Sequence, residues 1–256
     1  MKSQHIAALA LLGAILAGGA YSLTHTQLHA RGKLIVLAGQ SNAAGQESDA
    51  SLLPRDGIDA PFWWDEPSIG NGGMKWVRLS PQPSHIPAGH FGPEYGIAAQ
   101  IPDAAIFKFT SGATSLANDW RPGARSGLME RFSDELSLAM SQTDAEPYCF
   151  VFVQGESDAE TKEMAGAYGE RLKSLVGIVR SRMGPDVKIV LSVDELHPWI
   201  AANPEVVDAQ KNFEEADPKI RFSSFRDLPK ADSTHLVAAG TLEQGKRFAE
   251  TCKDIP

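Results

Sequence analysis

The sequence has little of what would mark several classes of protein. Among its 256 residues there are only 2 cysteines, too few for a disulfide scaffold and without the paired CxxC spacing of a zinc site. Lysine and arginine number 24 against 32 aspartates and glutamates, and no basic cluster stands out, so we expect no nucleic-acid partner. No internal repeat, low-complexity tract or linker interrupts the chain. What remains is an ordinary globular composition, 43% hydrophobic, in a chain long enough to bury one large core.

The first thirty residues have a composition unlike the rest of the chain. A lysine lies near the start, an apolar run of isoleucine, alanine, leucine and glycine extends over 6–20, and mostly polar residues follow from Tyr21 to Arg31. This is the layout of a secretory signal, and the run of about fifteen residues is shorter than the roughly twenty that span a membrane. We therefore expect residues 1–22 to be a cleaved signal peptide, or else an uncleaved N-terminal anchor. The protein is then exported, to the periplasm or as a secreted protein, and meets a membrane only if this segment stays attached.

Beyond Gly32, short apolar runs alternate with segments of helical periodicity. The runs are Lys33–Ala38, Ala104–Thr110, Tyr148–Val153, Val187–Val193 and Ile220–Phe225. Continuous hydrophobicity over a short run is typical of a strand covered on both faces, as in a parallel sheet. One helical segment repeats apolar residues from Tyr168 to Met183 and ends at Gly184-Pro185. The pattern predicts a single domain over residues 32–256, with helices on both sides of a five-stranded parallel sheet.

One stretch, 46–91, has little periodicity and reads as a long loop. A loop of this length in a compact domain is more often functional than decorative, and it follows the first strand, at the sheet edge where such folds bind ligands. Trp63 and Trp64 could stack on sugar rings there, or could pack the loop against the domain. His85 and His90 lie in the same stretch without carboxylate or cysteine neighbours, so we expect no metal site.

A serine follows the first predicted strand. Ser41 lies within Gly39–Gly45, where small residues would leave its hydroxyl and the nearby backbone N–H groups accessible. The spacing nearly matches the GxSxG elbow of α/β-hydrolases, but Ala43 stands where that motif has glycine. The segment therefore suits either a nucleophile or a serine that caps a helix or turn.

Polar residues also follow the very apolar run Tyr148–Val153. Ser157 or Asp158 could cap the next helix, but Gln154 and Glu156 have no such explanation. Polar side chains at the end of a buried strand are unusual unless they bind something. We therefore take Gln154 and Glu156 as candidate site residues.

An aspartate and a histidine lie just before the last predicted helix. Asp232 and His235 are spaced so that both can share one face of a turn. The carboxylate can then hold the imidazole tautomer while the other ring nitrogen faces a nucleophile. A capping aspartate and a surface histidine would explain the same spacing.

Together these segments resemble the SGNH (GDSL-like) hydrolase superfamily, and within it family six of the carbohydrate esterases and the sialate O-acetylesterase-like domain. The matching blocks run in the family's order through almost all of the chain after Gly32. They are Gly39–Gly45 (GQSNAAG), Gly92–Ala98 (GPEYGIA), Ser111–Leu116 (SGATSL) with Trp120 close behind, Gln154–Ala159 (QGESDA) and Asp232–His235 (DSTH). The resemblance implies a three-layer α/β/α sandwich with a flavodoxin-like sheet.

The resemblance also implies roles for individual residues. Ser41 would be the nucleophile, His235 the general base and Asp232 its orienting acid. The oxyanion hole would come from the Ser41 amide, the Gly112 amide and the Gln154 side chain. We add Gln40, beside Ser41, and Glu156 as further candidates for binding substrate.

The chain departs from the family pattern at two positions. Ala43 replaces the methionine that commonly follows GQSN, which should enlarge the floor of the pocket. Ala113 replaces the second of two glycines, so the oxyanion donor could be Ala113 instead of Gly112.

Other residues give weaker signals. Asp194, Glu195 and His197 follow the fourth predicted strand and could line the pocket. Cys149 lies in an apolar strand and Cys252 near the end of the chain, and an exported protein could pair them. A buried free thiol at Cys149 is the expectation that we favour.

The sequence therefore predicts an exported serine esterase that removes acetyl groups from a carbohydrate through an acetyl-enzyme, with no metal or organic cofactor. A carbohydrate O-acetyltransferase on the same fold is one alternative. A noncatalytic carbohydrate-binding module is another, although the presence of Ser41, Asp232 and His235 speaks against it. The sequence leaves the glycan, the hydroxyl that is deacetylated and the oligomeric state open.

Overall fold

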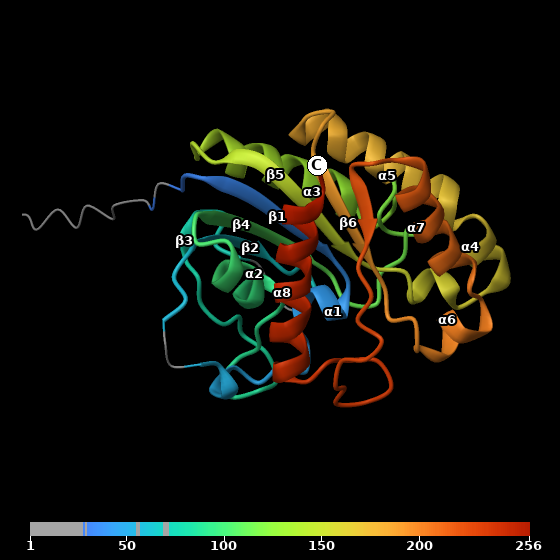
Figure 1. Ribbon diagram of the computed structural model, residues 1–256, viewed down its shortest axis with the longest axis horizontal. Helices are drawn as coiled ribbons and strands as arrows, with labels where there is room; N and C mark the ends of the chain where they lie inside the picture. The colour runs from blue at the N-terminus through green and yellow to red at the C-terminus, as the bar shows by residue number, and fades with distance from the viewer. Residues whose placement is uncertain (1–27, 29, 55–56, 69–71) are drawn as a thin grey trace, which may run out of the picture.

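A seven-stranded sheet forms the centre of the computed structural model, which describes residues 28, 30–54, 57–68 and 72–256 (Figure 1). The strands are β1 (Lys33–Gly39), β2 (Pro61–Asp65), β3 (Val77–Arg78), β4 (Ala104–Thr110), β5 (Glu146–Val153), β6 (Lys188–Ser192) and β7 (Ile220–Phe222). Their order across the sheet is β3-β2-β4-β1-β5-β6-β7. Only β3 runs antiparallel to its neighbour among these strands. The expected signal segment, 1–22, lies outside the described residues.

The five predicted strands correspond to β1, β4, β5, β6 and β7. Counted among themselves they follow the order 2-1-3-4-5, which is the flavodoxin-like order. The α/β fold is therefore confirmed, but the sheet is two strands wider than predicted. β2 and β3 come from the stretch 46–91, which the sequence predicted as a loop. β2 pairs in parallel with β4, with Phe62 opposite Ile106, so this short apolar run extends the sheet beyond β4.

Helices cover both faces of the sheet (Figure 1). They are α1 (Ser41–Ala44), α2 (Glu94–Gln100), α3 (Leu128–Ser141), α4 (Lys162–Gly166), α5 (Tyr168–Met183), α6 (Pro198–Ala202), α7 (Glu205–Ala216) and α8 (Ala238–Asp254), with short 3-10 turns at Ala50–Leu52 and Ser157–Ala159. Leu34 and Val36 of β1 pack into the core with α3, α5 and α7, whereas Ile35 and Leu37 pack into the core with α2 and α8. Successive strand residues point to opposite faces, and both faces are buried, which explains the unbroken apolar run.

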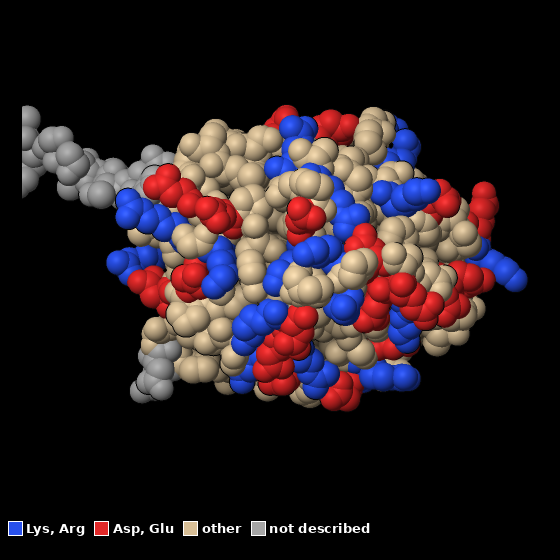
Figure 2. All heavy atoms as spheres, turned by 45° about the horizontal axis from the view of Figure 1, so that its top comes forward, with Lys and Arg blue, Asp and Glu red and all other residues tan. Residues whose placement is uncertain are grey.

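The surface carries charges of both signs. On the face shown in Figure 2, acidic and basic side chains are interspersed, so that face has no broad basic patch. In the described part of the chain, no helix is both long enough and apolar enough to cross a membrane.

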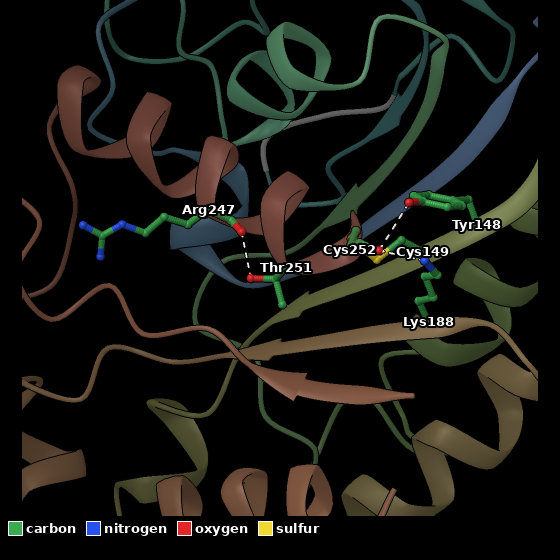
Figure 3. Close-up of a disulfide and its surroundings, with 6 residues drawn as sticks. All are labelled: Tyr148, Cys149, Lys188, Arg247, Thr251 and Cys252. Atoms are coloured by element: carbon green, nitrogen blue, oxygen red, sulfur yellow. Dashed lines mark hydrogen bonds between the residues drawn. A yellow bond between two sulfur atoms is a disulfide. The ribbon is translucent and has the colours of Figure 1, made fainter. Parts of the chain in front are cut away.

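A disulfide joins Cys149 of β5 to Cys252 of α8, with the two Cα atoms 6.0 Å apart (Figure 3). The expectation of a free thiol at Cys149 is therefore wrong. The two residues are far apart in sequence, but α8 packs on the face of the sheet toward which Cys149 points, and both side chains are buried. The Tyr148 hydroxyl and the Lys188 ammonium donate hydrogen bonds of 3.3 and 3.0 Å to the Cys252 carbonyl. They thereby satisfy one of the carbonyls that the end of a helix leaves unpaired.

Candidate active site

A pocket of about 500 Å³ opens at the carboxyl edge of the sheet. Its walls come from the segments that follow β1, β2, β4, β5 and β6, together with the loop before α8. The candidates Gln40, Ser41, Gly112, Glu156 and His235 all line it. This is the edge at which open parallel sheets bind ligands.

Two glycines shape the turn that carries Ser41. Gly39 ends β1 with a φ of 141°, and a Cβ atom there would lie 2.1 Å from the Val153 carbonyl oxygen. Gly45 ends α1 with a φ of 81°, and a Cβ there would lie 1.9 Å from the Phe91 oxygen. Only glycine tolerates such close approaches and such backbone angles. The turn therefore puts Ser41 at the first position of a short helix, where the helix leaves its backbone N–H without an acceptor.

The pair predicted before α8 is formed. Asp232 Oδ2 lies 2.8 Å from His235 Nδ1, and Asp232 Oδ1 accepts the backbone N–H groups of Thr234 and His235 at 2.6 and 2.7 Å. Partial burial favours the neutral acid, but these hydrogen bonds outweigh it and lower the pKa of Asp232 to about 2. Asp232 is therefore a carboxylate at neutral pH and holds Nδ1 of the imidazole as the protonated nitrogen.

Ser41 and His235 line the same pocket without a direct hydrogen bond between them in the described residues. His235 Nε2 has no hydrogen-bond partner in that part of the chain either. Contacts of this kind often tighten only when substrate binds.

Asn42 connects the serine turn to the histidine loop, and sequence reasoning missed it. Its side-chain nitrogen donates to the Thr234 carbonyl at 3.0 Å, and its side-chain oxygen accepts the Leu236 N–H at 3.3 Å. These bonds lie on the two sides of His235. The only signal in the sequence was the place of Asn42 directly after Ser41.

The segment after β4 brings two backbone positions into the pocket. The Gly112 N–H lies 3.4 Å from the Ser68 hydroxyl oxygen, a long contact that a substrate oxygen could replace. Ala113 lines the pocket with a φ of 55°, in the left-handed region that favours glycine. The departure from the two-glycine pattern thus falls on a strained position next to the expected oxyanion donor.

Gln154 does not have the free donor that the resemblance implied. Its side chain is buried and does not line the pocket, and Nε2 donates to the Thr114 carbonyl at 3.1 Å and to Asp158 Oδ2 at 2.8 Å. Both amide hydrogens are therefore used inside the protein. The physical reason is that Asp158 is also buried and competes for the donor.

Asp158 in turn fixes the loop that carries Gly112. Its carboxylate accepts the backbone N–H groups of Leu116 and Ala117 at 2.6 and 3.0 Å. Burial raises the pKa of Asp158, and the hydrogen bonds from Gln154 and the two amides oppose that rise. Gln154 therefore acts as a strut through Asp158 and not as an oxyanion donor in this conformation.

Glu156 and Gln40 complete the pocket floor. Glu156 is buried, and its Oε1 accepts the Asp194 N–H at 3.1 Å, while burial raises the pKa of its carboxyl group. Gln40 Oε1 is buried without a hydrogen-bond partner among the described residues.

A buried lysine binds the short helix that carries Ser41. Lys108 of β4 donates from Nζ to the Ala44 carbonyl at 2.8 Å, to Gln82 Oε1 at 2.7 Å and to Glu94 Oε1 at 3.2 Å. The side chains of Lys108 and Glu94 are 1% and 0% exposed, so this is a buried ion pair whose lysine uses all three donors. The Ala44 carbonyl belongs to α1, and the ion pair therefore holds the helix that carries Ser41.

Of the two interpretations that the sequence left open for Trp63 and Trp64, packing against the domain is the one that the structure shows. Trp63 is fully buried and stacks on Phe107, and Trp64 packs against the other core, so neither lines the pocket. Because β2 is a strand and not a loop, Trp63 lies in one core and Trp64 is partly buried against the other. Trp199 of α6, which the sequence analysis did not single out, is the tryptophan among the described residues that line the pocket, and it is 42% exposed.

Of the residues after β6, one lines the pocket and two form ion pairs outside its lining. His197 lines the pocket, and its Nδ1 accepts the Trp199 N–H at 3.2 Å. Asp194 is buried against Lys230 at 2.5 Å, and Glu195 lies 3.5 Å from Lys211, so neither carboxylate lines the pocket.

Each histidine of the stretch 46–91 has a carboxylate partner that the sequence did not reveal. His90 Nε2 lies 3.1 Å from Glu66 Oε2, with both side chains buried, and His85 Nε2 lies 3.6 Å from Glu47 Oε2. The pairing of His90 depends on β2, because Glu66 directly follows that strand and lines the pocket. In the described part of the chain no three potential ligands gather as a metal site would require.

A flavodoxin-like sheet, a serine after its first strand and an Asp–His pair before its last helix define a hydrolase of the SGNH type. The family described as "Carbohydrate esterase, sialic acid-specific acetylesterase" matches residues 31–254, and the chain belongs to this family of carboxylic ester hydrolases. No curated protein sequence matches it.

Solved structures share the fold at low sequence identity. A protein from Arabidopsis thaliana is 18% identical, with a TM-score of 0.68 over 88% of this chain and 100% of that one. NanS is 16% identical, with a TM-score of 0.65 over 88% of this chain and 97% of its own. A carbohydrate acetylesterase from Xanthomonas citri is 17% identical, with a TM-score of 0.54 over 88% of this chain and 56% of that one.

Proposed function

We propose that this protein hydrolyses acetyl esters of a carbohydrate, with Ser41 as nucleophile, His235 as general base and Asp232 as the group that orients His235. The observation that carries the proposal is the meeting of Ser41 and His235 in one pocket, with His235 Nδ1 bonded to Asp232. Ser41 follows the first strand, whereas Asp232 and His235 precede the last helix, and the fold brings these distant segments together.

In this mechanism His235 Nε2 takes the proton of the Ser41 hydroxyl while Oγ attacks the acetyl carbonyl carbon. The carbonyl oxygen becomes negative and accepts hydrogen bonds from the backbone N–H of Ser41 and from that of Gly112 or Ala113. The tetrahedral intermediate expels the sugar oxygen, which takes the proton from His235. Water, deprotonated by His235, then attacks the acetyl-enzyme; the bond to Ser41 Oγ breaks, acetate is released, and His235 returns the proton to Ser41.

Asp232 contributes through its charge and its position. Because its pKa is lowered to about 2, it stays ionised while His235 carries the transferred proton. A carboxylate that accepts the Nδ1 hydrogen stabilises the imidazolium and keeps Nε2 free for Ser41.

Labelling and hydrolysis test the proposal together. A fluorophosphonate should add one adduct at Ser41, seen by mass spectrometry, and Ser41→Ala should lower kcat for p-nitrophenyl acetate by roughly a thousandfold or more. The matched control is Ser157→Ala, since Ser157 also lines the pocket. Ser157→Ala should keep the adduct at Ser41. An adduct at Ser157, or an active Ser41→Ala variant, would overturn the assignment of Ser41 as the nucleophile. A second measurement, the release of acetate in the presence of a sugar acceptor, separates a hydrolase from a transferase.

We also propose that the protein is exported. The apolar segment at 6–20 and the Cys149–Cys252 disulfide support this, because structural disulfides persist in oxidising compartments outside the cytoplasm. N-terminal sequencing of the protein recovered from a bacterial periplasm tests it. A mature chain that begins near residue 22 is the expected result, and an intact, membrane-bound N-terminus would identify an anchor.

A further inference from the structure

The pocket contains carboxylates but no lysine or arginine among the described residues that line it. Its acidic members are Glu66 and Glu156. A sugar that carries its own carboxylate is normally held by arginine or lysine, because the guanidinium fork matches that group. The lining of this pocket therefore suits a different kind of sugar.

Among the described residues, Lys230 and His85 each lie beside an acidic side chain. Lys230 is close enough to His197 to contribute to the lowered pKa of that imidazole, which burial chiefly causes, but Lys230 is paired with Asp194 at 2.5 Å. His85 is held beside Glu47 at 3.6 Å. To pair with Lys230 or His85, a bound carboxylate would have to compete with these acidic partners.

Glu66 is held in place by His90. The side chains are 6% and 2% exposed, and the Nε2–Oε2 distance is 3.1 Å. His90 is itself fixed, because its backbone N–H and carbonyl both bond to Gln82, at 2.9 and 2.8 Å. Glu66 Oε1 has no hydrogen bond in the described part of the chain. A carboxylate held in this way is a preorganised acceptor for hydroxyl groups, and such charged acceptors make strong hydrogen bonds.

Trp199 provides an apolar surface in the same pocket. It is 42% exposed, whereas Trp63, Trp76 and Trp120 are buried. His197 holds it, with a 3.2 Å hydrogen bond to its backbone N–H and a ring centroid 5.2 Å away. A rigid, exposed indole can cover the apolar face of a pyranose ring.

We infer that the pocket selects acetyl esters of uncharged sugars and rejects those of sialic or uronic acids, with Glu66 accepting sugar hydroxyls and Trp199 supporting the ring. The inference rests on the proposed function. An acidic sugar would place its carboxylate in a pocket whose described lining offers Glu66 and no lysine or arginine, which is specificity by repulsion. The family description names sialic acid, so an ester of that acid is the substrate against which the inference has to be tested.

A pair of acetyl esters tests the inference directly. Acetate release is measured from a mono-O-acetylated methyl xylopyranoside and from 9-O-acetyl-N-acetylneuraminic acid, with p-nitrophenyl acetate as the reporter of catalysis. We expect kcat/KM to be at least tenfold higher for the neutral sugar ester. Equal or higher kcat/KM for the sialic acid ester, with p-nitrophenyl acetate hydrolysed, would overturn the inference alone. Failure to hydrolyse p-nitrophenyl acetate would overturn the proposed function.

Variants then test the two residues. Glu66→Gln should shift the ratio of the two kcat/KM values at least fivefold toward the acidic ester, and Glu160→Gln, the same change of charge at an exposed residue outside the pocket lining, should not. Trp199→Ala should raise KM for the neutral ester severalfold, with Trp199→Phe restoring much of it. The exposed Leu196 does not line the pocket, so Leu196→Ala should leave KM unchanged. An unchanged ratio in Glu66→Gln, or an unchanged KM in Trp199→Ala, would remove that residue from substrate recognition.

Discussion

Asn42 donates a hydrogen bond of 3.0 Å from its side-chain nitrogen to the carbonyl oxygen of Thr234. The same side chain accepts the Leu236 N–H at 3.3 Å, so one amide holds the backbone on both sides of His235. The residue next to the proposed nucleophile thereby sets the position of the proposed base. Asn42 therefore links the turn that carries Ser41 directly to the loop that carries His235.

Replacing Asn42 should lower both the stability of the protein and its kcat, and a control variant should lower stability alone. Asn42→Ala removes two hydrogen bonds, which should lower the free energy of unfolding by about 1–3 kcal/mol and kcat for p-nitrophenyl acetate by roughly tenfold or more, because a misplaced base slows proton transfer. Asn203→Ala is the matched control, since Asn203 donates a 2.8 Å bond to the Ala159 carbonyl away from the proposed triad. Urea unfolding and steady-state kinetics measure both effects. Equal losses of kcat in the two variants would contradict a positioning role for Asn42.

Gln154 should affect stability in a way that depends on pH. The hydrogen bond from its Nε2 opposes the rise that burial causes in the pKa of Asp158, so Gln154→Ala should raise that pKa further. A carboxyl group whose pKa is higher in the folded state binds more protons there than in the unfolded chain. Stability then falls as pH rises from the unfolded pKa to the folded one.

Urea unfolding between pH 4 and pH 8 measures this effect. The stability of Gln154→Ala should fall more steeply with rising pH than that of the parent protein. Combining the change with Asp158→Asn should abolish the difference, because the titrating group is gone. A Gln154→Ala variant with the parent's pH dependence of stability but a much lower kcat would favour the oxyanion role after all.

The Lys108–Glu94 pair should be far more important than ion pairs at the surface. Lys108→Met leaves Glu94 as an unpaired buried carboxylate, and breaking such a pair typically costs about 3–5 kcal/mol. Lys33→Met is the control, because Lys33 and Asp103 form an exposed pair at 3.1 Å, and such pairs contribute less than about 1 kcal/mol. Thermal and urea unfolding compare the two. Similar small losses would contradict the buried pair, and the double variant Lys108→Met with Glu94→Gln should recover part of the loss.

The disulfide should matter for stability and not for catalysis. It closes a loop of 103 residues, for which chain-entropy estimates give about 4–5 kcal/mol of stabilisation. Reduction, or Cys252→Ala, should lower the melting temperature substantially while p-nitrophenyl acetate is still hydrolysed at low temperature, because neither cysteine lines the pocket. A reductant that changes the melting temperature of the Cys252→Ala variant would indicate that its effect does not come from this bond.

Much of the fold was predictable from local patterns. The unbroken apolar runs predicted β1, β4, β5, β6 and β7 because a strand buried on both faces has no polar side. β2 was missed because its run is short and lies among glycines and prolines, where its partner β4 is what makes it a strand. The burial of Trp63, one of two interpretations that the sequence left open, is decided by the same pairing.

In the site, too, contacts between residues close in sequence were easier to predict than contacts between distant residues. The contact between Asp232 and His235 spans one turn, so their spacing in the sequence made it one of two possible arrangements, and the structure shows that it forms. The pairing of Cys149 with Cys252 depends on where α8 packs, and no local pattern contains that.

Gln154 shows why the remaining roles needed the tertiary structure. Its place after a buried strand predicted a polar group at the edge of the sheet, which is correct, but the number of hydrogens it has free depends on its neighbours. Asp158 and the Thr114 carbonyl take both of them. Sequence spacing determines which groups a turn or a strand can present, because local geometry is regular. Competition for a hydrogen bond is decided by whatever the fold brings within about 3 Å, and that is a property of the packed chain.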